Sequence, residues 1–147
     1  LLGTPCEALT TSQMVQVEAV TAFFYPDVFL VCDDLRMGKQ QSILNPKIIF
    51  EVLSPSTGRR DRYEKFRAYQ TIESLQEYFL VHQDTAQIEA YRRQPDGTWN
   101  PNVYTVYVGL GTTLVLESMG IGVPLRMIYY RVELPDAEAL SQETERL

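Results

Sequence analysis

The stretch that decides the fold is Lys47-Ile48-Ile49-Phe50-Glu51-Val52-Leu53-Ser54, a run of β-branched and apolar residues interrupted by one carboxylate. Because side chains alternate between the two faces of a strand, Glu51 is expected on the same face as Ile49 and Leu53. A carboxylate among apolar neighbours loses solvation, so such groups are usually paired with a cation or bind a metal ion. The stretch therefore predicts a buried central strand that carries either a salt-bridged structural glutamate or a functional one.

Two segments before this strand also have strand character, and a helix is expected after it. Residues 13–20 alternate loosely between polar and apolar, and Val28–Cys32 is a short apolar run typical of a buried strand. Residues 54–58 contain Ser, Pro and Gly, which end a strand. We expect a helix from about residue 59 to residue 71, with three apolar residues at helical spacing that face the sheet: Phe66, Tyr69 and Ile72.

The second half of the chain has mostly strand character. Glu77–His82 and Ile88–Arg93 predict a hairpin, and two further strands are expected at 103–108 and 113–116. Leu125–Tyr130 fits a helical turn or a strand equally well. This order, strands followed by one helix and then further strands, predicts an α+β (mixed α/β) fold with a central mixed sheet and a flanking helix. One domain is expected over residues 1–134, followed by a polar C-terminal tail at 135–147.

The composition limits the classes of protein. The chain has 147 residues, of which 45% are hydrophobic, enough for one domain with its own core. A net charge of −6 argues against a generic nucleic-acid coat protein, but not against a nuclease whose acids lie at a metal site. Cys6, Cys32 and the single histidine, His82, lack zinc-ligand spacing. The two cysteines could pair, but nothing indicates secretion, so free thiols in a cytoplasmic protein are the simpler expectation. No apolar run approaches the ~20 residues that cross a bilayer, so no membrane partner is expected.

A second candidate carboxylate is Asp27, which follows Pro26 at the start of the strand at Val28–Cys32. Taken alone, Asp27 is more simply a turn residue and Glu51 a structural residue. Taken together, they stand at the boundaries of two apolar strands that could lie side by side. Two carboxylates brought together in this way favour a site for a hard divalent cation.

The candidate cationic residues lie on the predicted helix. Lys65 follows Asp61 by four residues, so the two share one helix face and could form an ordinary surface ion pair. Alternatively, Lys65 points toward the two carboxylates and stabilises negative charge there. The densest basic cluster of this acidic chain surrounds it and forms either a solvated helix face or a set of phosphate contacts: Arg59, Arg60, Arg62 and Arg67.

These motifs resemble a known family. The carriers are Tyr25-Pro26-Asp27-Val28, the string from Asn45 to Thr57 that contains Glu51-Val52-Leu53-Ser54-Pro55-Ser56-Thr57, and the downstream Asp61, Lys65-Phe66, Tyr69 and Ser74–Tyr78. Over roughly residues 1–133 the chain resembles the Uma-two family of restriction-endonuclease-like proteins, which belongs to the PD-(D/E)XK nuclease superfamily.

The resemblance implies a site and a cofactor. It implies that Asp27, Glu51 and the main-chain carbonyl of Val52 bind Mg²⁺ or Mn²⁺, and that the metal activates a water for attack on a phosphodiester. The superfamily places a lysine two residues after the second acid, where this chain has Leu53. In this family Lys65 resembles its displaced replacement. Two residues on the same helix are the expected supporting members of the site: Asp61 and Tyr69.

The resemblance also bears on assembly and activity. The family usually begins with a helical segment, and residues 1–6 resemble its end, so an N-terminal helical part is expected to be missing. A bare flank of the sheet would favour a homo-oligomer, most simply a dimer. Three hypotheses follow: a metal-dependent DNA endonuclease, a non-catalytic binding or assembly module with the nuclease fold, and, more remotely, a hydrolase of another phosphodiester.

Overall fold

A computed structural model of the chain describes residues 5–54 and 59–134, with side chains of its longer helix described from Arg62 onward. Ten strands, two helices and two short 3₁₀ turns follow one another in these ranges: β1 Glu7–Thr10, β2 Val15–Val17, η1 Glu18–Val20, β3 Ala22–Phe24, β4 Val28–Val31, η2 Lys39–Gln41, β5 Ile48–Leu53, α1 Arg59–Tyr69, β6 Glu77–His82, β7 Gln87–Arg92, β8 Thr105–Val108, β9 Thr113–Leu116, β10 Ile121–Pro124 and α2 Leu125–Ile128.

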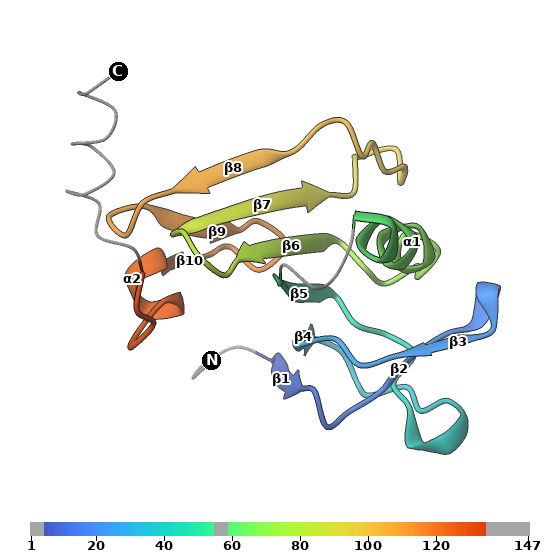
Figure 1. Ribbon diagram of the computed structural model, residues 1–147. Coiled ribbons are helices and arrows are strands. Elements are labelled where there is room, and N and C mark those ends of the chain that lie inside the picture. Colours follow the sequence, from blue (N-terminus) through green and yellow to red (C-terminus); the bar gives the residue numbers. More distant parts are fainter. Residues whose placement is uncertain (1–4, 55–58, 135–147) are drawn as a thin grey trace, which may run out of the picture.

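A six-stranded mixed sheet in the order β1-β4-β5-β6-β7-β8 forms the centre of the molecule. Only β5 and β6 run parallel, and α1 is the crossover between them; the other neighbours in this sheet are antiparallel. Figure 1 shows α1 on one face of the sheet and the β9–β10 hairpin with α2 on the other. The central mixed sheet with a flanking helix, expected from the sequence, is therefore confirmed.

Two apolar cores cover the two faces of the sheet. On the α1 face, Phe66, Tyr69 and Ile72 pack against strand residues such as Ile49 and Tyr78, which confirms the expected helix face. On the other face, residues of the β9–β10 hairpin and of α2 pack against alternate positions of β4 to β7, among them Leu30, Phe79 and Ile88. Because side chains alternate along each strand, neighbouring residues of one strand supply both cores.

The short elements differ from the expectation. The predicted strand at 13–20 is reduced to β2 and η1, and β1, β3 and β10 were not predicted. These strands have only three or four residues, and β1 is mostly exposed, so the local pattern is too short to reveal them. The segment 125–130, which fitted helix or strand, begins as the helical turn α2. The expected tail at 135–147 lies outside the described residues.

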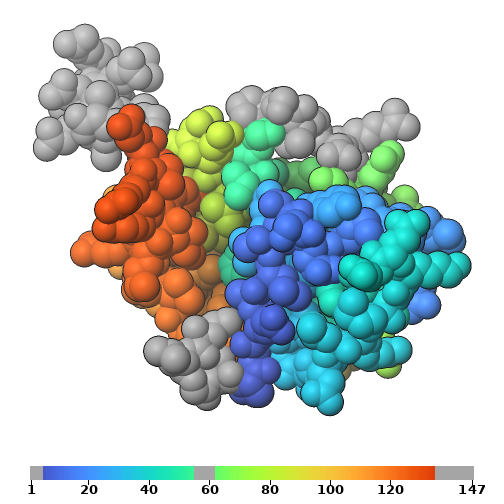
Figure 2. Space-filling view, turned by 90° about the horizontal axis from the view of Figure 1, so that it is seen from below, coloured from blue at the N-terminus to red at the C-terminus, as the bar shows by residue number. Residues whose placement is uncertain are grey.

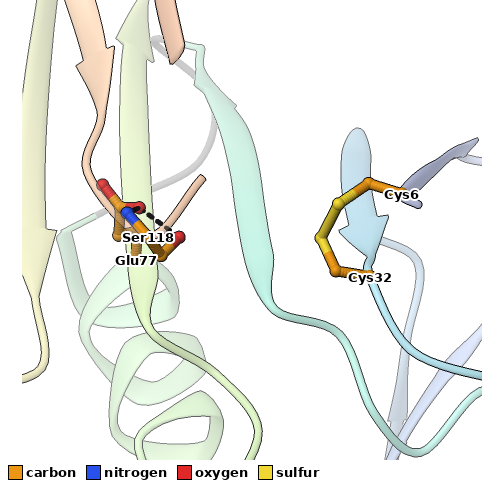
Figure 3. Close-up of a disulfide and its surroundings, with 4 residues drawn as sticks. All are labelled: Cys6, Cys32, Glu77 and Ser118. Atoms are coloured by element: carbon orange, nitrogen blue, oxygen red, sulfur yellow. Dashed lines mark hydrogen bonds between the residues drawn. A yellow bond between two sulfur atoms is a disulfide. The ribbon is translucent and has the colours of Figure 1, made fainter. Parts of the chain in front are cut away.

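The expectation of free thiols is wrong for this structure. Cys6 and Cys32 form a disulfide that joins the N-terminal edge of the sheet to its neighbour (Figure 3). The register of β1 on β4 pairs Glu7 with Val31, so the residues just outside this pair face each other. Because this register arises from strand pairing over 26 residues of sequence separation, the sequence alone could not show it. Disulfides are typical of oxidising environments, so this bridge does not support the expected cytoplasmic location, which stays a prediction.

A buried polar network attaches the β9–β10 hairpin to the sheet. Glu77 is only 1% exposed, and its carboxylate accepts hydrogen bonds from Arg92 Nε (3.0 Å) and from the backbone N–H of Ser118 (2.7 Å). The Ser118 hydroxyl donates to the same carboxylate (Figure 3). This acid is fully partnered within the fold, so we assign it a structural role. Among the described residues, no helix is long and apolar enough to span a membrane.

Candidate active site

The register of β4 on β5 brings the two candidate carboxylates together. These strands are antiparallel and Val28 pairs with Phe50, so extending the ladder by one residue places Asp27 opposite Glu51. The Asp27 carboxylate accepts a hydrogen bond from the backbone N–H of Val52, with 2.7 Å between Oδ2 and N. This bond orients the Asp27 side chain toward β5, where it lies within hydrogen-bonding reach of the Glu51 carboxyl group.

Glu51 is a buried carboxyl group, 8% exposed, on the face of β5 that packs against α1. Burial raises its pKa to about 7, and the nearby charge of Asp27 acts in the same direction. The positive charge of Lys65 and a hydrogen bond from Tyr69 lower this pKa, but less than burial raises it. The Tyr69 hydroxyl donates to Glu51 Oε1 at 3.1 Å. The site therefore balances two close carboxylates against one lysine and one phenol.

Helix α1 directs three polar residues toward the strands. Arg62, Lys65 and Tyr69 follow one another at intervals of three and four residues, so they share one face of the helix. Lys65 and Arg62 line a small cavity of about 30 Å³ beside Glu51. The structure thus places Lys65 near the carboxylate pair, and its role there stays a prediction. The side chains of Arg59, Arg60 and Asp61, also expected to belong to the site, lie outside the described residues.

Arg62 has a partner that the sequence did not single out. Its terminal nitrogen donates to Glu89 Oε2 at 2.9 Å, and the Tyr91 hydroxyl donates to the same oxygen at 3.1 Å. His82 Nε2 lies 3.3 Å from Glu89 Oε1. A signal for Glu89 exists in the sequence, since it stands between Ile88 and Ala90 of a predicted strand as Glu51 does in its own. Two of its three partners, Arg62 and His82, however, come from other elements and follow only from the fold.

The residues present fit a divalent metal ion. Two carboxylates and the Val52 carbonyl are oxygen donors, which hard cations such as Mg²⁺ and Mn²⁺ prefer. The raised pKa of Glu51 has burial as its main cause, and a cation beside it would compensate for that lost solvation. Among the described residues, no group of three or more His, Cys, Asp or Glu side chains is placed to hold a metal ion. The carboxylate pair would therefore bind a metal together with main-chain oxygen and water.

The fold and the carboxylate pair define a class, a nuclease-like α+β domain with two acids at the centre of a mixed sheet. The chain belongs to the Uma2 family, described as "Putative restriction endonuclease", whose sequence pattern matches residues 2–126. A solved structure with a similar fold is that of "a putative nuclease belonging to DUF820" from Anabaena variabilis ATCC 29413. It superimposes with a TM-score of 0.65 at 12% identity and covers 87% of this chain and 70% of that one.

Two curated relatives are also similar to the chain, both from Synechocystis sp. (strain ATCC 27184 / PCC 6803 / Kazusa). "Uncharacterized protein slr1290" is 33% identical over 127 residues, 86% of this chain and 65% of its own length. "Uncharacterized protein sll1609" is 33% identical over 95 residues, 63% of this chain and 54% of its own length. The chain therefore spans less than two thirds of the relatives it matches.

Proposed function

We propose that this chain is a divalent-metal-dependent endonuclease that hydrolyses phosphodiester bonds in DNA. The observation that carries the proposal is the pairing of Asp27 with Glu51 across β4 and β5, with Lys65 close enough to lower the pKa of Glu51. Two carboxylates on neighbouring strands, with a lysine close to them, are suited to binding a metal ion and a phosphate together. Membership of the Uma2 family supports the same reaction class.

Each residue of the site has a distinct role in this proposal. Asp27, Glu51 and the Val52 carbonyl hold Mg²⁺ or Mn²⁺, which when bound would supply Lewis-acid activation of a water. Lys65 stabilises the negative charge that develops on the phosphate. Tyr69 fixes the Glu51 carboxylate through its hydroxyl, and Asp61 supports the same helix face. Phosphate contacts are proposed for three arginines at the start of α1: Arg59, Arg60 and Arg62.

A plasmid-nicking assay with Mn²⁺ tests the proposal. We expect the parent chain to nick supercoiled DNA, Glu51→Gln and Asp27→Asn to fall to background, and Lys65→Ala to lose about a hundredfold. Asp96→Asn, at the exposed turn that follows β7, is the matched control and should nick at the parent rate. Nicking by Glu51→Gln at the parent rate would contradict the assignment.

A second candidate function is a non-catalytic binding or assembly module that keeps the nuclease fold. The net charge of −6 and the raised pKa of Glu51 favour it, because a carboxyl group that is partly protonated at neutral pH binds metal less readily. This candidate requires that the parent binds a partner without nicking DNA under any metal. Turnover of a generic phosphodiester without cleavage of DNA would instead indicate a different phosphodiester hydrolase.

The working form in this proposal is a homodimer that acts on DNA in the cytoplasm. The β8 edge of the six-stranded sheet supports the dimer, since within residues 5–54 and 59–134 β8 pairs on one side only and exposes Val106 and Val108. A dimer would also present two sites to the two strands of a duplex.

A further inference from the structure

A further cavity, on the α1 face of the sheet, has a lining suited to a nucleotide. It has a volume of about 650 Å³ and lies between α1, the adjoining ends of β6 and β7, and the segment that leads to β8. Six of its lining residues carry the argument: Arg62, Tyr63, His82, Glu89, Tyr91 and Asn102. Its volume falls within the ~300–1,000 Å³ of small-molecule sites, and its walls combine cations, an amide and aromatic rings.

The cavity adjoins the small cavity beside Glu51, and the two have wall residues in common. Arg62 and Leu80 line both this cavity and the small cavity beside Glu51. Leu80 pairs with Glu51 on one side and with Glu89 on the other, so these three residues form one row across β5, β6 and β7. A chain of nucleotides whose reacting phosphate lies at Glu51 would therefore have its next unit over this row.

The polar wall of the cavity is held by Glu89. Its carboxylate contacts Arg62 of α1 and His82 at the end of β6, and its side chain is 13% exposed, while theirs are 33% and 29% exposed. The acid thus anchors both donors from the protein side while they remain partly open to the solvent. A guanidinium has five N–H donors, so the bond to Glu89 leaves it able to bind a phosphate as well.

Aromatic residues supply the other half of the lining. Tyr63 is 55% exposed and Tyr91 lies deeper, with Asn102 at the rim of the cavity. Exposed rings bind nucleobases by stacking without selecting their sequence, and an amide side chain can hydrogen-bond base edges. The guanidinium of Arg62 and the ring of Tyr63 line the same cavity, so they suit the phosphate and the base of one nucleotide.

We infer that this cavity, which we call the Arg62–His82 pocket, binds the nucleotide next to the phosphate that is attacked at Asp27 and Glu51. Arg62 and His82 bind its phosphate, and Tyr63 stacks on its base. Arg62 and His82 are therefore binding residues and Glu89 a positioning residue. The inference rests on the proposed function for the place of the reacting phosphate, but nucleotide binding in the pocket is measurable without any metal.

The rival explanation is purely structural, because Arg62, Glu89 and His82 also join α1 to two strands. The two explanations differ in what a surface change does. Tyr63 is largely exposed, so Tyr63→Ala should leave stability nearly unchanged but weaken nucleotide binding. His82→Gln retains a polar side chain of similar reach and removes the imidazole.

The test is the binding of a fluorescently labelled deoxydinucleotide, measured by fluorescence anisotropy in EDTA at low salt. We expect His82→Gln and Tyr63→Ala each to weaken binding by about tenfold, the size of one stacking or charge-assisted contact. Arg126→Gln, which removes an exposed cation from α2 on the opposite face, is the matched control and should bind as the parent does. Urea unfolding of each variant shows whether a loss of binding reflects a loss of folded protein.

The outcomes separate this inference from the proposed function. Parent-like binding by His82→Gln and Tyr63→Ala, or no binding by the parent, would overturn the pocket even if the parent nicks plasmid DNA and Asp27→Asn does not. Selective loss in the two pocket variants would support it. If no chain nicks DNA while that selective loss is seen, the nuclease proposal fails and the pocket remains a nucleotide-binding site.

Discussion

Glu51 is unfavourable for the fold because its carboxyl group is buried, and it is also the central residue of the proposed site. Ile49, which precedes it on the same face of β5, is fully buried, and Glu51 itself is only 8% exposed. Tyr69 and Lys65 compensate only part of the lost solvation, since the pKa stays near 7. A group placed at such a cost, beside a second carboxylate, is better explained by a ligand than by packing.

The stability of the metal-free protein should therefore depend on pH through Glu51. Its folded pKa of about 7 exceeds the ordinary value of 4.5, so the folded state holds the proton more tightly than the unfolded state does. The free energy of unfolding therefore falls as pH rises from about 4.5 to about 7, by up to roughly 3 kcal/mol. Because glutamine does not titrate, Glu51→Gln should be the more stable chain near pH 8.

Urea unfolding in EDTA, compared at about pH 8 and about pH 4.5, measures this difference. Near the lower pH the parent carboxyl group is protonated in the folded state and about half protonated in the unfolded state, so the gap between the two chains should largely close. Equal unfolding midpoints for parent and Glu51→Gln near pH 8 would show that the buried carboxylate of Glu51 does not destabilise the folded state.

At the scale of elements, one buried aromatic residue, Phe66, anchors α1 and with it the site residues on that helix. Phe66 is buried and its ring contacts three other aromatic rings, those of Tyr78, Tyr91 and Trp99, with centroids 4.7 to 5.7 Å away. Lys65 and Tyr69, which share one face of the helix, stand one residue before and three residues after this anchor. The position of the proposed catalytic lysine therefore depends on the packing of its neighbour.

We expect Phe66→Ala to lower the free energy of unfolding by about 3–5 kcal/mol, the usual cost of removing a buried aromatic side chain. Arg67→Ala, at the adjacent and exposed position of the same helix, should change it by less than about 0.5 kcal/mol. Circular dichroism during urea unfolding measures both. Similar losses in the two variants would mean that α1 is not held by this aromatic cluster.

The disulfide gives the N-terminal edge strand a second attachment. β1 pairs with β4 over four residues and is largely exposed, so strand pairing is its main other contact with the sheet. β4 in turn begins directly after Asp27, which belongs to the site. Closing a loop of this length stabilises the fold by about 3.5 kcal/mol in the chain-entropy estimate.

Cys6→Ser should therefore lower the unfolding free energy under oxidising conditions by about that amount. The same comparison with a reductant present is the control, because the parent then lacks the bridge as well and the two chains should unfold alike. A parent that unfolds identically with and without reductant would indicate that the two thiols are not paired in solution.

At the scale of the whole molecule, the surroundings of the site differ from those of the outer edge of β8. The space-filling view of Figure 2 shows the N-terminal strands and the C-terminal segment around α2 on opposite sides of one face, with β5 and β6 visible between them. A cavity of about 390 Å³ at this boundary has Asp27 and Val52 on its wall. Asp27 is therefore accessible from the boundary between the N-terminal strands and the segment around α2.

The opposite flank ends in β8, whose outer edge is unpaired among the described residues. Val103, Val106 and Val108 are each more than 40% exposed there. We expect the chain to form a dimer through this edge, and Val106→Lys to shift it toward the monomer because charge on an edge strand opposes strand pairing. Sedimentation velocity across a concentration series measures the shift; Val115→Lys, on the exposed side of β9, is the matched control.

The sequence by itself determined the central strand at Glu51, the apolar face of α1 and the candidate pair of Asp27 with Glu51. Periodicity and the cost of burying a charge are properties of short segments, so they can be read without knowing the fold. The third member, Lys65, was expected from its place on the helix and is found beside Glu51.

Only the tertiary structure decided which distant residues meet. The Cys6–Cys32 bridge, the grouping of Arg62 and His82 around Glu89, and the attachment of the β9–β10 hairpin through Glu77 all depend on strand register. Register is set by the packing of the whole sheet, and a shift of one residue would turn every side chain to the other face. No local pattern carries that information, so these contacts follow from the fold alone.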